Sequence, residues 1–583
     1  MEMVNIKINN MPLSVPKGIT ILEAARYAGV EIPTLCYLKE MNEIGACRMC
    51  MVEVKGARSL VAACVFPVNE GMEVFTNSEK VRKSRKTNLE LVLSTHNKAC
   101  LTCVRSGNCE LQKLCKDYGV EDAVKFEGAY PEAQYDDSAA HMIRDNSKCI
   151  LCRRCVAACD NQAISVIGAS ARGFDTHISS PFELPLNDFS CVSCGQCIVH
   201  CPVGAIYEKD DTAKVFAAIN DPEKFVVVNT APSIRVTLGE CFGNEIGTNV
   251  TGKMVAALRR LGFDKVFDTD FSADLTIMEE ATELLDRINN GGVLPLITSC
   301  SPGWVKYCEH YFPEQIDHLS SCKSPQQMFG AVIKTWYAKK MNLDPKDIVV
   351  VSIMPCTAKK FECGREDQSA SGYADVDYAL TTRELGRMIE TAGIAFNMLP
   401  DEEFDNPLGE GSGAGVIFGA TGGVMEAALR TAVETLTGEE LKNLEFTEVR
   451  GIEGLKEATY TVAGMDIKVC AASGLKNAQT VMEKIKNGEA DYHFVEIMAC
   501  PGGCVNGGGQ PVQPASVHNF VDLKALRGKA LYAADENLPV RKSHENEAVK
   551  AVYAEYFEKP GSHIAHEVLH THYVARSKYN NNK

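Results

Sequence analysis

Two runs of four cysteines with the same spacing, Cys-x2-Cys-x2-Cys-x3-Cys, constrain this chain more than any other feature. The first run is Cys149, Cys152, Cys155 and Cys159, and the second is Cys191, Cys194, Cys197 and Cys201, followed by Pro202. The chain has 25 cysteines in 583 residues, and its N-terminus lacks the pattern of a secretory signal peptide. In such a chain, clustered Cys-x2-Cys spacings indicate metal or redox sites rather than disulfides. We therefore expect a cytoplasmic protein whose cysteines stay reduced.

The spacing of this repeat is that of bacterial ferredoxins that hold two [4Fe–4S] clusters. In those proteins the fourth cysteine of each run completes the other cluster. The pattern therefore predicts one cluster on Cys149, Cys152, Cys155 and Cys201, and a second on Cys191, Cys194, Cys197 and Cys159. We assign both to a ferredoxin-like domain over residues 140–209, which follows a charged linker at residues 120–146.

Another iron–sulfur pattern lies near the N-terminus. Residues 4–16 alternate in polarity around Asn9-Asn10, which predicts a β-hairpin, and residues 21–29 predict a short amphipathic helix. Four cysteines in a plant-type [2Fe–2S] order follow, although the first gap is longer than usual. They are Cys36, Cys47, Cys50 and Cys64. Zinc is the alternative ligand, but the hairpin and helix favour a [2Fe–2S] ferredoxin-like domain over residues 1–78.

Residues 79–120 contain one histidine and three cysteines at short spacing. They are His96, Cys100, Cys103 and Cys109. Taken alone, this set suits zinc as well as an iron–sulfur cluster. Beside a ferredoxin-like domain, it resembles the [4Fe–4S] module of hydrogenases and of the large iron–sulfur subunit of respiratory complex I. Cys115 is left over and is interpreted as a packed thiol.

From about residue 210 the pattern becomes that of an α/β domain, which we assign to residues 210–520. Five apolar runs end abruptly in polar or small residues, at 225–229, 293–297, 348–353, 415–418 and 494–498. Ligands of open α/β sheets bind beyond the carboxyl ends of the strands. We therefore expect one crevice lined by Ser233, Cys300, Cys356, Gly419, Cys500 and Cys504. Glycines close to the last two cysteines would let the backbone approach a bulky inorganic ligand.

Three cysteine signatures in this domain resemble those of the [FeFe]-hydrogenases in order and spacing. They are Thr-Ser-Cys-Ser-Pro-Gly-Trp (298–304), Met-Pro-Cys-Thr-Ala-Lys-Lys-Phe-Glu (354–362) and Glu-Ile-Met-Ala-Cys-Pro-Gly-Gly-Cys (496–504). The resemblance covers nearly the whole chain and implies reversible hydrogen activation at an H-cluster. That group joins a [4Fe–4S] unit to a di-iron unit with CO, cyanide and a dithiolate. Cys504 corresponds to the bridging ligand, and Cys356 and Cys500 correspond to ligands of the cubane.

The first signature departs from the family, which usually has two adjacent cysteines after Thr-Ser. Here the pair is Cys300-Ser301. By position, Cys300 keeps the role of the proton-relay thiol, and Ser301 takes the place of the cubane ligand. A serine alkoxide is a harder donor than a thiolate and would shift the cluster potential. The alternatives are that Cys300 becomes the ligand or that Cys322 substitutes.

The resemblance also assigns residues around the di-iron unit. Lys359 would point its ammonium at a cyanide ligand rather than lie on the surface. Met354 and Met498 would pack on the di-iron unit, although methionines at such positions are more often core residues. Other lining positions are Pro232, Ser233, Pro325 and Gln326.

A proton path is implied as well. Glu280, Glu283 and Arg287 share one face of a predicted helix, where the simple interpretation is a solvated, salt-bridged surface. In the family, a relay of carboxylates and a serine leads to the thiol. The matching path here is Arg287, Glu283, Ser320, Glu280 and Cys300.

Residues 521–583 predict a charged helical segment that resembles the separate small subunit of some relatives. Its histidines could bind a metal, but a capping helix is the simpler interpretation. They are His563, His566, His570 and His572.

The remaining features concern partners. The net charge of −16 argues against a nucleic-acid binder, and no apolar stretch is long enough to span a membrane. No Gly-x-Gly-x-x-Gly fingerprint follows a strand, so nicotinamide chemistry would belong to another subunit. We expect the substrates to be hydrogen and protons, and the electron partners to be ferredoxin or flavin- and NAD(P)-binding subunits. An electron-transfer subunit and a hydrogen sensor are the competing functions, and the three signatures and the relay disfavour them.

Overall fold

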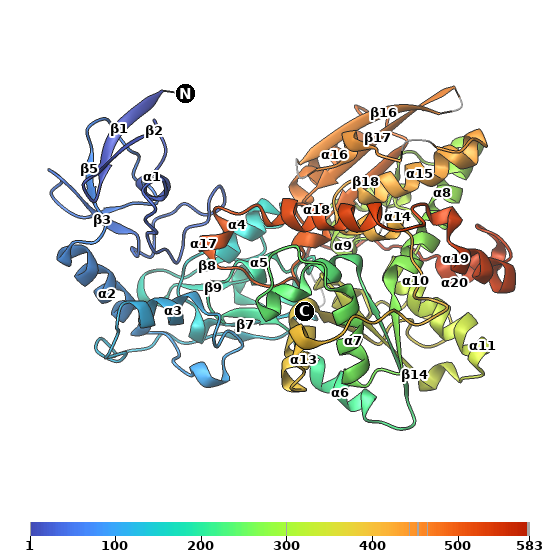
Figure 1. Cartoon of the computed structure of the whole chain (residues 1–583), viewed down its shortest axis with the longest axis horizontal. Coiled ribbons are helices and arrows are strands. Elements are labelled where there is room, and N and C mark those ends of the chain that lie inside the picture. Colours follow the sequence, from blue (N-terminus) through green and yellow to red (C-terminus); the bar gives the residue numbers. More distant parts are fainter. Residues whose placement is uncertain (1, 299, 442–443, 452–453, 463, 580–583) are drawn as a thin grey trace.

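The computed structural model describes residues 2–298, 300–441, 444–451, 454–462 and 464–579. Figure 1 shows the N-terminal domain at one end of the long axis and the catalytic domain at the other. The two-run cysteine domain, with α4 (Arg154–Asn161) and α5 (Gln196–Val199), lies between them. The order of parts in space thus follows their order in the sequence, apart from the C-terminal segment.

The N-terminal domain is a five-stranded sheet covered by one helix. Asn9 and Asn10 have φ angles of 50° and 69°, as a tight hairpin turn requires, and the predicted hairpin is confirmed. The predicted helix begins at a capping box between Thr20 and Glu23. The sheet order is β2 (Met11–Pro16), β1 (Met3–Ile8), β5 (Glu73–Phe75), β3 (Met51–Val54), β4 (Val61–Ala62), and the helix is α1 (Ile21–Tyr27).

Two helices and a small sheet connect this domain to the catalytic domain. The helices are α2 (Glu79–Leu93) and α3 (Glu110–Asp117). The sheet pairs β10 (Ile206–Glu208), β7 (Met142–Asp145) and β6 (Tyr135–Asp136). The last two strands lie inside the stretch predicted to be a linker, so the prediction of a linker over all of 120–146 is wrong at its C-terminal end.

The catalytic domain contains two four-stranded sheets, and the predicted α/β class is confirmed. One sheet is wholly parallel, with the order β12 (Lys265–Asp268), β11 (Phe225–Thr230), β14 (Ile348–Met354), β15 (Tyr378–Thr381). The other has the order β13 (Leu296–Ile297), β18 (Phe494–Met498), β17 (Met465–Ser473), β16 (Leu455–Val462), and only its last pair is antiparallel. All three signature cysteine segments follow strand ends, after β13, β14 and β18.

One of the five expected strands is a helix. Residues 415–418 belong to α14 (Gly413–Val416) and a following single turn, because Ser412 caps a helix by accepting from the Gly415 amide. Glycine also fits here because a Cβ at Gly415 would lie 2.7 Å from the Asp270 carbonyl oxygen. The run at 293–297 forms a strand only over its last two residues.

The C-terminal segment is helical, as predicted, and packs across the catalytic domain. Its helices are α18 (Leu523–Glu536), α19 (Glu547–Val552) and α20 (His563–Leu569). Figure 1 shows α18 crossing in front of α14, which it contacts. Buried ion pairs hold it there: Arg430 on α15 (Gly423–Thr437) donates to Asp535 at 2.8 Å, and Arg527 donates to Glu240 at 2.7 Å. Among the described residues, no helix combines the length and apolarity that a membrane crossing needs.

We predict that Asp535→Asn loosens the C-terminal segment. Burial opposes the charge of Asp535, but hydrogen bonds from Arg541 and Arg430 hold its pKa below the usual value. Removing one partner of such a buried pair costs about 3–5 kcal/mol. The loosening should appear as faster amide hydrogen exchange in α18. The control Glu547→Gln, at an exposed position of α19, should leave the exchange rates in α18 almost unchanged. Because the folded pKa is depressed, the wild-type contact should also weaken as the pH falls below about 4. Unchanged exchange in Asp535→Asn would contradict this.

Candidate functional site

Four thiols from three strand-end segments meet in the catalytic domain. After burial, the neighbours that most raise the pKa of the Cys500 thiol are Cys356 and Cys504, and those that most raise the pKa of Cys504 are Cys356 and Cys300. Burial, followed by the Glu280 carboxylate, raises the pKa of Cys300 to about 12. Burial raises the pKa of the other three as well. Neutral thiols in a dry pocket gain most from a bound cation, which favours their deprotonation.

Glycines shape the wall around these thiols. Gly503 has a φ of +93°, and a Cβ there would lie 2.7 Å from the Thr421 amide nitrogen. A Cβ at Gly507 would lie 2.2 Å from the Pro355 carbonyl oxygen. The loop after Cys500 therefore packs backbone against backbone, which only glycine permits.

Cys300 and Ser301 stand at the start of α9 (Pro302–Tyr311). Ser301 occupies the N-cap position, but its side chain makes no capping hydrogen bond to the helix. Cys300 packs with Cys504 against the cluster of buried side chains that contains Met498. Cys322 has different neighbours, because after burial the groups that most raise its pKa are the carboxylates of Glu283, Glu280 and Glu279. Cys300, and not Cys322, therefore joins the thiol group.

Lys359 is buried beside Cys300 and is not a surface lysine. Its Nζ donates to the Cys300 carbonyl at 3.2 Å, to Ser324 Oγ at 2.8 Å and to Glu362 at 2.9 Å. Gln326, on α10 (Pro325–Val332), also donates to Glu362 at 3.1 Å. These contacts hold one positive charge at the edge of the thiol group.

Most of the remaining predicted lining residues lie at or just after strand ends, and Pro325 begins α10. Ser233 is fully buried and accepts a hydrogen bond from Gln510, which also donates to the Cys504 carbonyl at 3.0 Å. Met354 and Met498 are the buried last residues of β14 and β18. Pro232 and Pro325 are buried at the first positions of their helices. The structure thus links Ser233 to Cys504 through Gln510 and buries the other four residues, and their place around the H-cluster stays a prediction.

The predicted relay residues lie on and beside α8 (Thr269–Asn290). Arg287 donates to Glu283 at 2.6 Å, and Ser320 donates to the same carboxylate at 3.2 Å. Glu280 is 1% exposed and lies close enough to Cys300 to raise the pKa of its thiol. This helix face is therefore packed against the protein interior and is not the solvated surface that the simple interpretation predicts.

The cysteines of the two-run domain group across the runs. After burial, the neighbours that most raise the pKa of Cys155 are Cys152, Cys149 and Cys201. Those that most raise the pKa of Cys194 are Cys500, Cys191 and Cys159. The fourth cysteine of each run therefore faces the other run. Because Cys500 belongs to the catalytic crevice, the second group also adjoins the four catalytic thiols.

The N-terminal cysteines form two close pairs. Cys50 Sγ lies 3.3 Å from Cys64 Sγ, and the Cys47 amide donates to Cys36 Sγ at 3.5 Å. A hydrogen bond from the Cys36 thiol lowers the pKa of Cys47 to about 6. Such pairs suit two metal ions that each take two thiolates.

The histidine-containing module also has an available donor. Burial lowers the pKa of His96 to about 4, so its imidazole is neutral at physiological pH. Within the described chain, its buried Nδ1 has no hydrogen-bond partner. Neutral imidazole is the metal-binding form. Burial and the neighbouring Cys103 raise the pKa of Cys109, and burial, Cys109 and Cys100 raise the pKa of Cys115. Cys115 is a half-buried thiol that packs against the core.

Direct contacts join these groups in sequence. Asn42 Nδ2 donates to the carbonyls of Cys36 and Cys152, at 2.8 and 2.9 Å. The Glu110 amide, next to Cys109, donates to the Pro202 carbonyl at 3.1 Å. Two groups therefore converge on the first group of the two-run domain, and the second group leads to the catalytic crevice.

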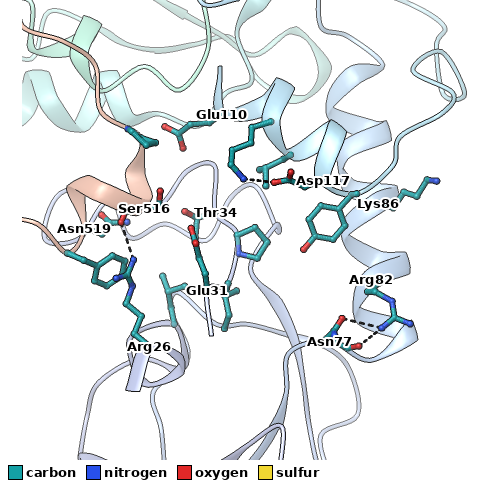
Figure 2. Close-up of a pocket in the computed structure, with 18 of the residues that line it drawn as sticks. Arg26, Glu31, Thr34, Asn77, Arg82, Lys86, Glu110, Asp117, Ser516 and Asn519 are labelled. Carbon is teal, nitrogen blue, oxygen red and sulfur yellow. Dashed lines mark hydrogen bonds and ion pairs between the residues drawn. The ribbon is translucent and has the colours of Figure 1, made fainter. Parts of the chain in front are cut away.

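A separate pocket of about 840 Å³ lies between the N-terminal domain, α2, α3 and residues 514–520 (Figure 2). Arg26 donates to the Ser516 carbonyl at 3.1 Å and lies over the Phe520 ring. Charges of both signs line the walls, and its described lining includes no cysteine. The pocket is an interdomain cavity, distinct from the catalytic crevice.

Sequence reasoning missed two residues at the crevice. Glu496 accepts hydrogen bonds from the Gly422 and Met425 amides, both at 2.7 Å, and burial raises its pKa to about 7. A carboxylate within an otherwise apolar strand was the available signal. Gln510 had no signal, since its role depends on a loop that returns to the crevice.

The four C-terminal histidines do not converge on one metal. His563 is 90% exposed and pairs with Glu567, while His566 stacks on His570 at 4.0 Å between ring centroids. Of the four, His570 alone joins a possible metal-binding group within the described residues, with Glu283 and Cys322.

Five protein-family models match successive parts of the chain. The catalytic domain matches the iron-only hydrogenase large subunit, C-terminal domain, over residues 224–508, and the C-terminal segment matches the iron hydrogenase small subunit over 521–576. The others are a 2Fe-2S iron-sulfur cluster binding domain (1–79), the NADH-ubiquinone oxidoreductase-G iron-sulfur binding region (85–123) and a 4Fe-4S dicluster domain (148–205).

Relatives match along the whole chain. NADP-reducing hydrogenase subunit HndD of Solidesulfovibrio fructosivorans is 48% identical over 99% of this chain and 100% of its own. Iron hydrogenase 1 of Clostridium pasteurianum is 44% identical, with 98% and 100% covered. This chain belongs to the iron-only hydrogenase family. A solved [FeFe]-hydrogenase structure, HydA(deltaEFG), matches with a TM-score of 0.56 and 42% identity over 63% of this chain and 99% of that one.

The chain is therefore a hydrogenase that activates hydrogen at an H-cluster served by iron–sulfur domains. The residues at the crevice fit that group. Four thiols converge there, a buried ammonium stands beside them, and the glycines leave backbone rather than side chains at the wall.

We predict that Gly503→Ala prevents H-cluster binding, because the added Cβ collides with backbone in a conformation already strained for alanine. Gly488→Ala is the matched control, with a φ of +70° and nothing within 4 Å of the new Cβ. Infrared spectra should lose the CO and cyanide bands in the first variant only. Normal bands in Gly503→Ala would show that the loop tolerates a side chain.

Proposed function

We propose that this chain is the hydrogen-activating subunit of a multi-subunit hydrogenase that exchanges electrons with flavin- and NAD(P)-binding subunits or with ferredoxin. The observation that carries the proposal is the continuous series of thiol groups that ends at the catalytic crevice. The relative named as a subunit of an NADP-reducing hydrogenase, alike over its full length, supports the choice of partners. The chain itself has no dinucleotide fingerprint. Purification of the native protein tests this choice of partners, because flavin- and NAD(P)-binding subunits should purify together with it.

The accessory groups would hold one [2Fe–2S] and three [4Fe–4S] clusters. The [2Fe–2S] cluster would use Cys36, Cys47, Cys50 and Cys64. The first [4Fe–4S] cluster would use His96, Cys100, Cys103 and Cys109. The other two would use Cys149, Cys152, Cys155 and Cys201, and Cys191, Cys194, Cys197 and Cys159. Twenty-five free cysteines accord with a reducing compartment, and we place the protein in the cytoplasm.

At the crevice, Cys356, Cys500 and Cys504 would hold the cubane, with Cys504 bridging to the di-iron unit. We assign the fourth position to Ser301, whose hydroxyl is not used to cap its helix. Cys300 remains available as the relay thiol, since it faces Glu280. When bound, the H-cluster supplies the redox centre at which hydrogen is formed or split.

The protein's own groups would bring protons to that centre. A thiol can release and regain a proton, so Cys300 can pass protons between the cluster and Glu280. Ser320 and Glu283 would continue the path outward, and Arg287 would hold the Glu283 carboxylate in place. Lys359 would fix a positive charge beside a cyanide ligand, and Met354, Met498, Pro232, Ser233, Pro325 and Gln326 would line the cavity.

A pair of variants tests these assignments. Cys300→Ala should lower turnover by at least about 100-fold while CO and cyanide bands persist, because a relay thiol is lost but no ligand. Ser301→Ala should instead lose the cubane and those bands. Cys308→Ala is the control, because it removes a buried thiol from α9, the helix that follows Cys300 and Ser301. If Cys300→Ala destroys the bands, Cys300 is the ligand. If it retains both bands and full turnover, protons take another path.

A further inference from the structure

The outer end of the proposed relay lacks a group that can supply protons. Arg287 holds Glu283, and a guanidinium group is not a proton donor in proteins, so Arg287 cannot deliver a proton. A titratable group in contact with Glu283 is needed. The C-terminal segment provides one in His570.

An unbroken series of hydrogen bonds connects His570 to Glu283. Ser321 Oγ lies 2.8 Å from His570 Nδ1 and donates to Glu283 Oε2 at 3.1 Å. On the other side, His570 Nε2 lies 3.0 Å from Glu279 Oε2, and Tyr553 donates to Glu279 Oε1 at 2.5 Å. The backbone fixes this geometry, because Thr571 donates to the Ser321 carbonyl at 2.7 Å.

The directions of these bonds define where a proton is held. Because Ser321 gives its hydroxyl hydrogen to Glu283, the hydrogen between Ser321 and His570 must come from Nδ1. Glu279 already accepts from Tyr553 and from the Gly561 amide, so its carboxylate favours a second hydrogen on Nε2. The network therefore offers a hydrogen-bond acceptor to each ring nitrogen of His570.

A proton can leave this arrangement by one balanced step. The N–H bond at Nδ1 breaks as the proton moves to Ser321 Oγ, and the Ser321 O–H bond breaks as its proton moves to Glu283 Oε2. One proton leaves His570, one arrives at Glu283, and the serine remains a hydroxyl. No oxidant or other reactant is required.

Resting on the proposed function, we propose that His570 is the proton-exchanging residue at the outer end of the relay, acting on Glu283 through Ser321, with Glu279 and Tyr553 positioning its ring. The side chain of His570 is 6% exposed, and its ring centroid lies 4.0 Å from that of the exposed His566. The charged and titratable groups facing it are Glu279, Glu283, Cys322, Tyr553 and His566.

The test uses the fully matured enzyme. His570→Gln keeps hydrogen-bonding atoms but cannot carry the proton, so turnover should fall about tenfold or more, with a larger solvent isotope effect and unchanged CO and cyanide bands. His570→Ala should behave likewise and regain activity when imidazole is added, which a structural defect would not do. His563→Ala, at the start of α20 and 90% exposed, should match the wild type.

A second readout needs no turnover. In protein prepared without the di-iron unit, infrared difference spectra over a pH titration should show an imidazole band changing together with a carboxyl band. His570→Gln should lack both changes.

The outcomes separate this inference from the proposed function. If Glu283→Gln retains full turnover, the relay itself is refuted. If Glu283→Gln is inactive while His570→Gln and His570→Ala keep wild-type turnover and isotope effect, only the role of His570 is refuted. The role of His570 would also be refuted if His570→Ala lost turnover that imidazole did not restore while His570→Gln kept full turnover.

Discussion

The whole structure depends on how closely its thiols are buried together. Burial raises the pKa of Cys155, Cys194 and Cys197 well above the ordinary value, and neighbouring thiols raise it further. As bare thiolates, such groups would repel one another in a medium of low dielectric constant. Iron changes the balance, because metal binding to these groups contributes directly to the free energy of folding. In the two-run domain, Cys155, Cys159, Cys197 and Cys201 are part of the buried core, and in the N-terminal domain Cys50 and Cys64 are.

The catalytic crevice lies where two sheets end, and in the mechanism that we propose electrons and protons approach it along different elements. The Cys194 group reaches it beside Cys500, after β18, where Gln196 donates to the Asn506 carbonyl at 3.0 Å. The relay reaches it beside Cys300, after β13, along α8. The C-terminal segment packs on α8, and its His570 joins the relay's hydrogen bonds. The segment that matches the iron hydrogenase small subunit is thus part of the proton path that we propose.

Much of this was predictable, for identifiable reasons. Cysteine spacing is set by cluster geometry, so it predicted which runs would face one another, and the abrupt strand ends predicted the crevice. Residues 415–418 misled because apolar runs do not distinguish a short strand from a buried helix. His570 could not be linked to Glu283 from sequence, since the contact spans the chain and depends on backbone pairing with residues 321–323. Gln510 could not be predicted either, since its contacts with Ser233 and Cys504 depend on how the loop folds back to the crevice.

The most direct measurement is the iron and sulfide content of protein purified anaerobically without di-iron maturation, together with its electron paramagnetic resonance spectrum. Our account predicts signals from one [2Fe–2S] cluster and from [4Fe–4S] clusters at the two-run domain, the histidine module and the catalytic crevice, with chelation causing the accessory domains to unfold. A colourless, zinc-loaded protein that folds normally would contradict it.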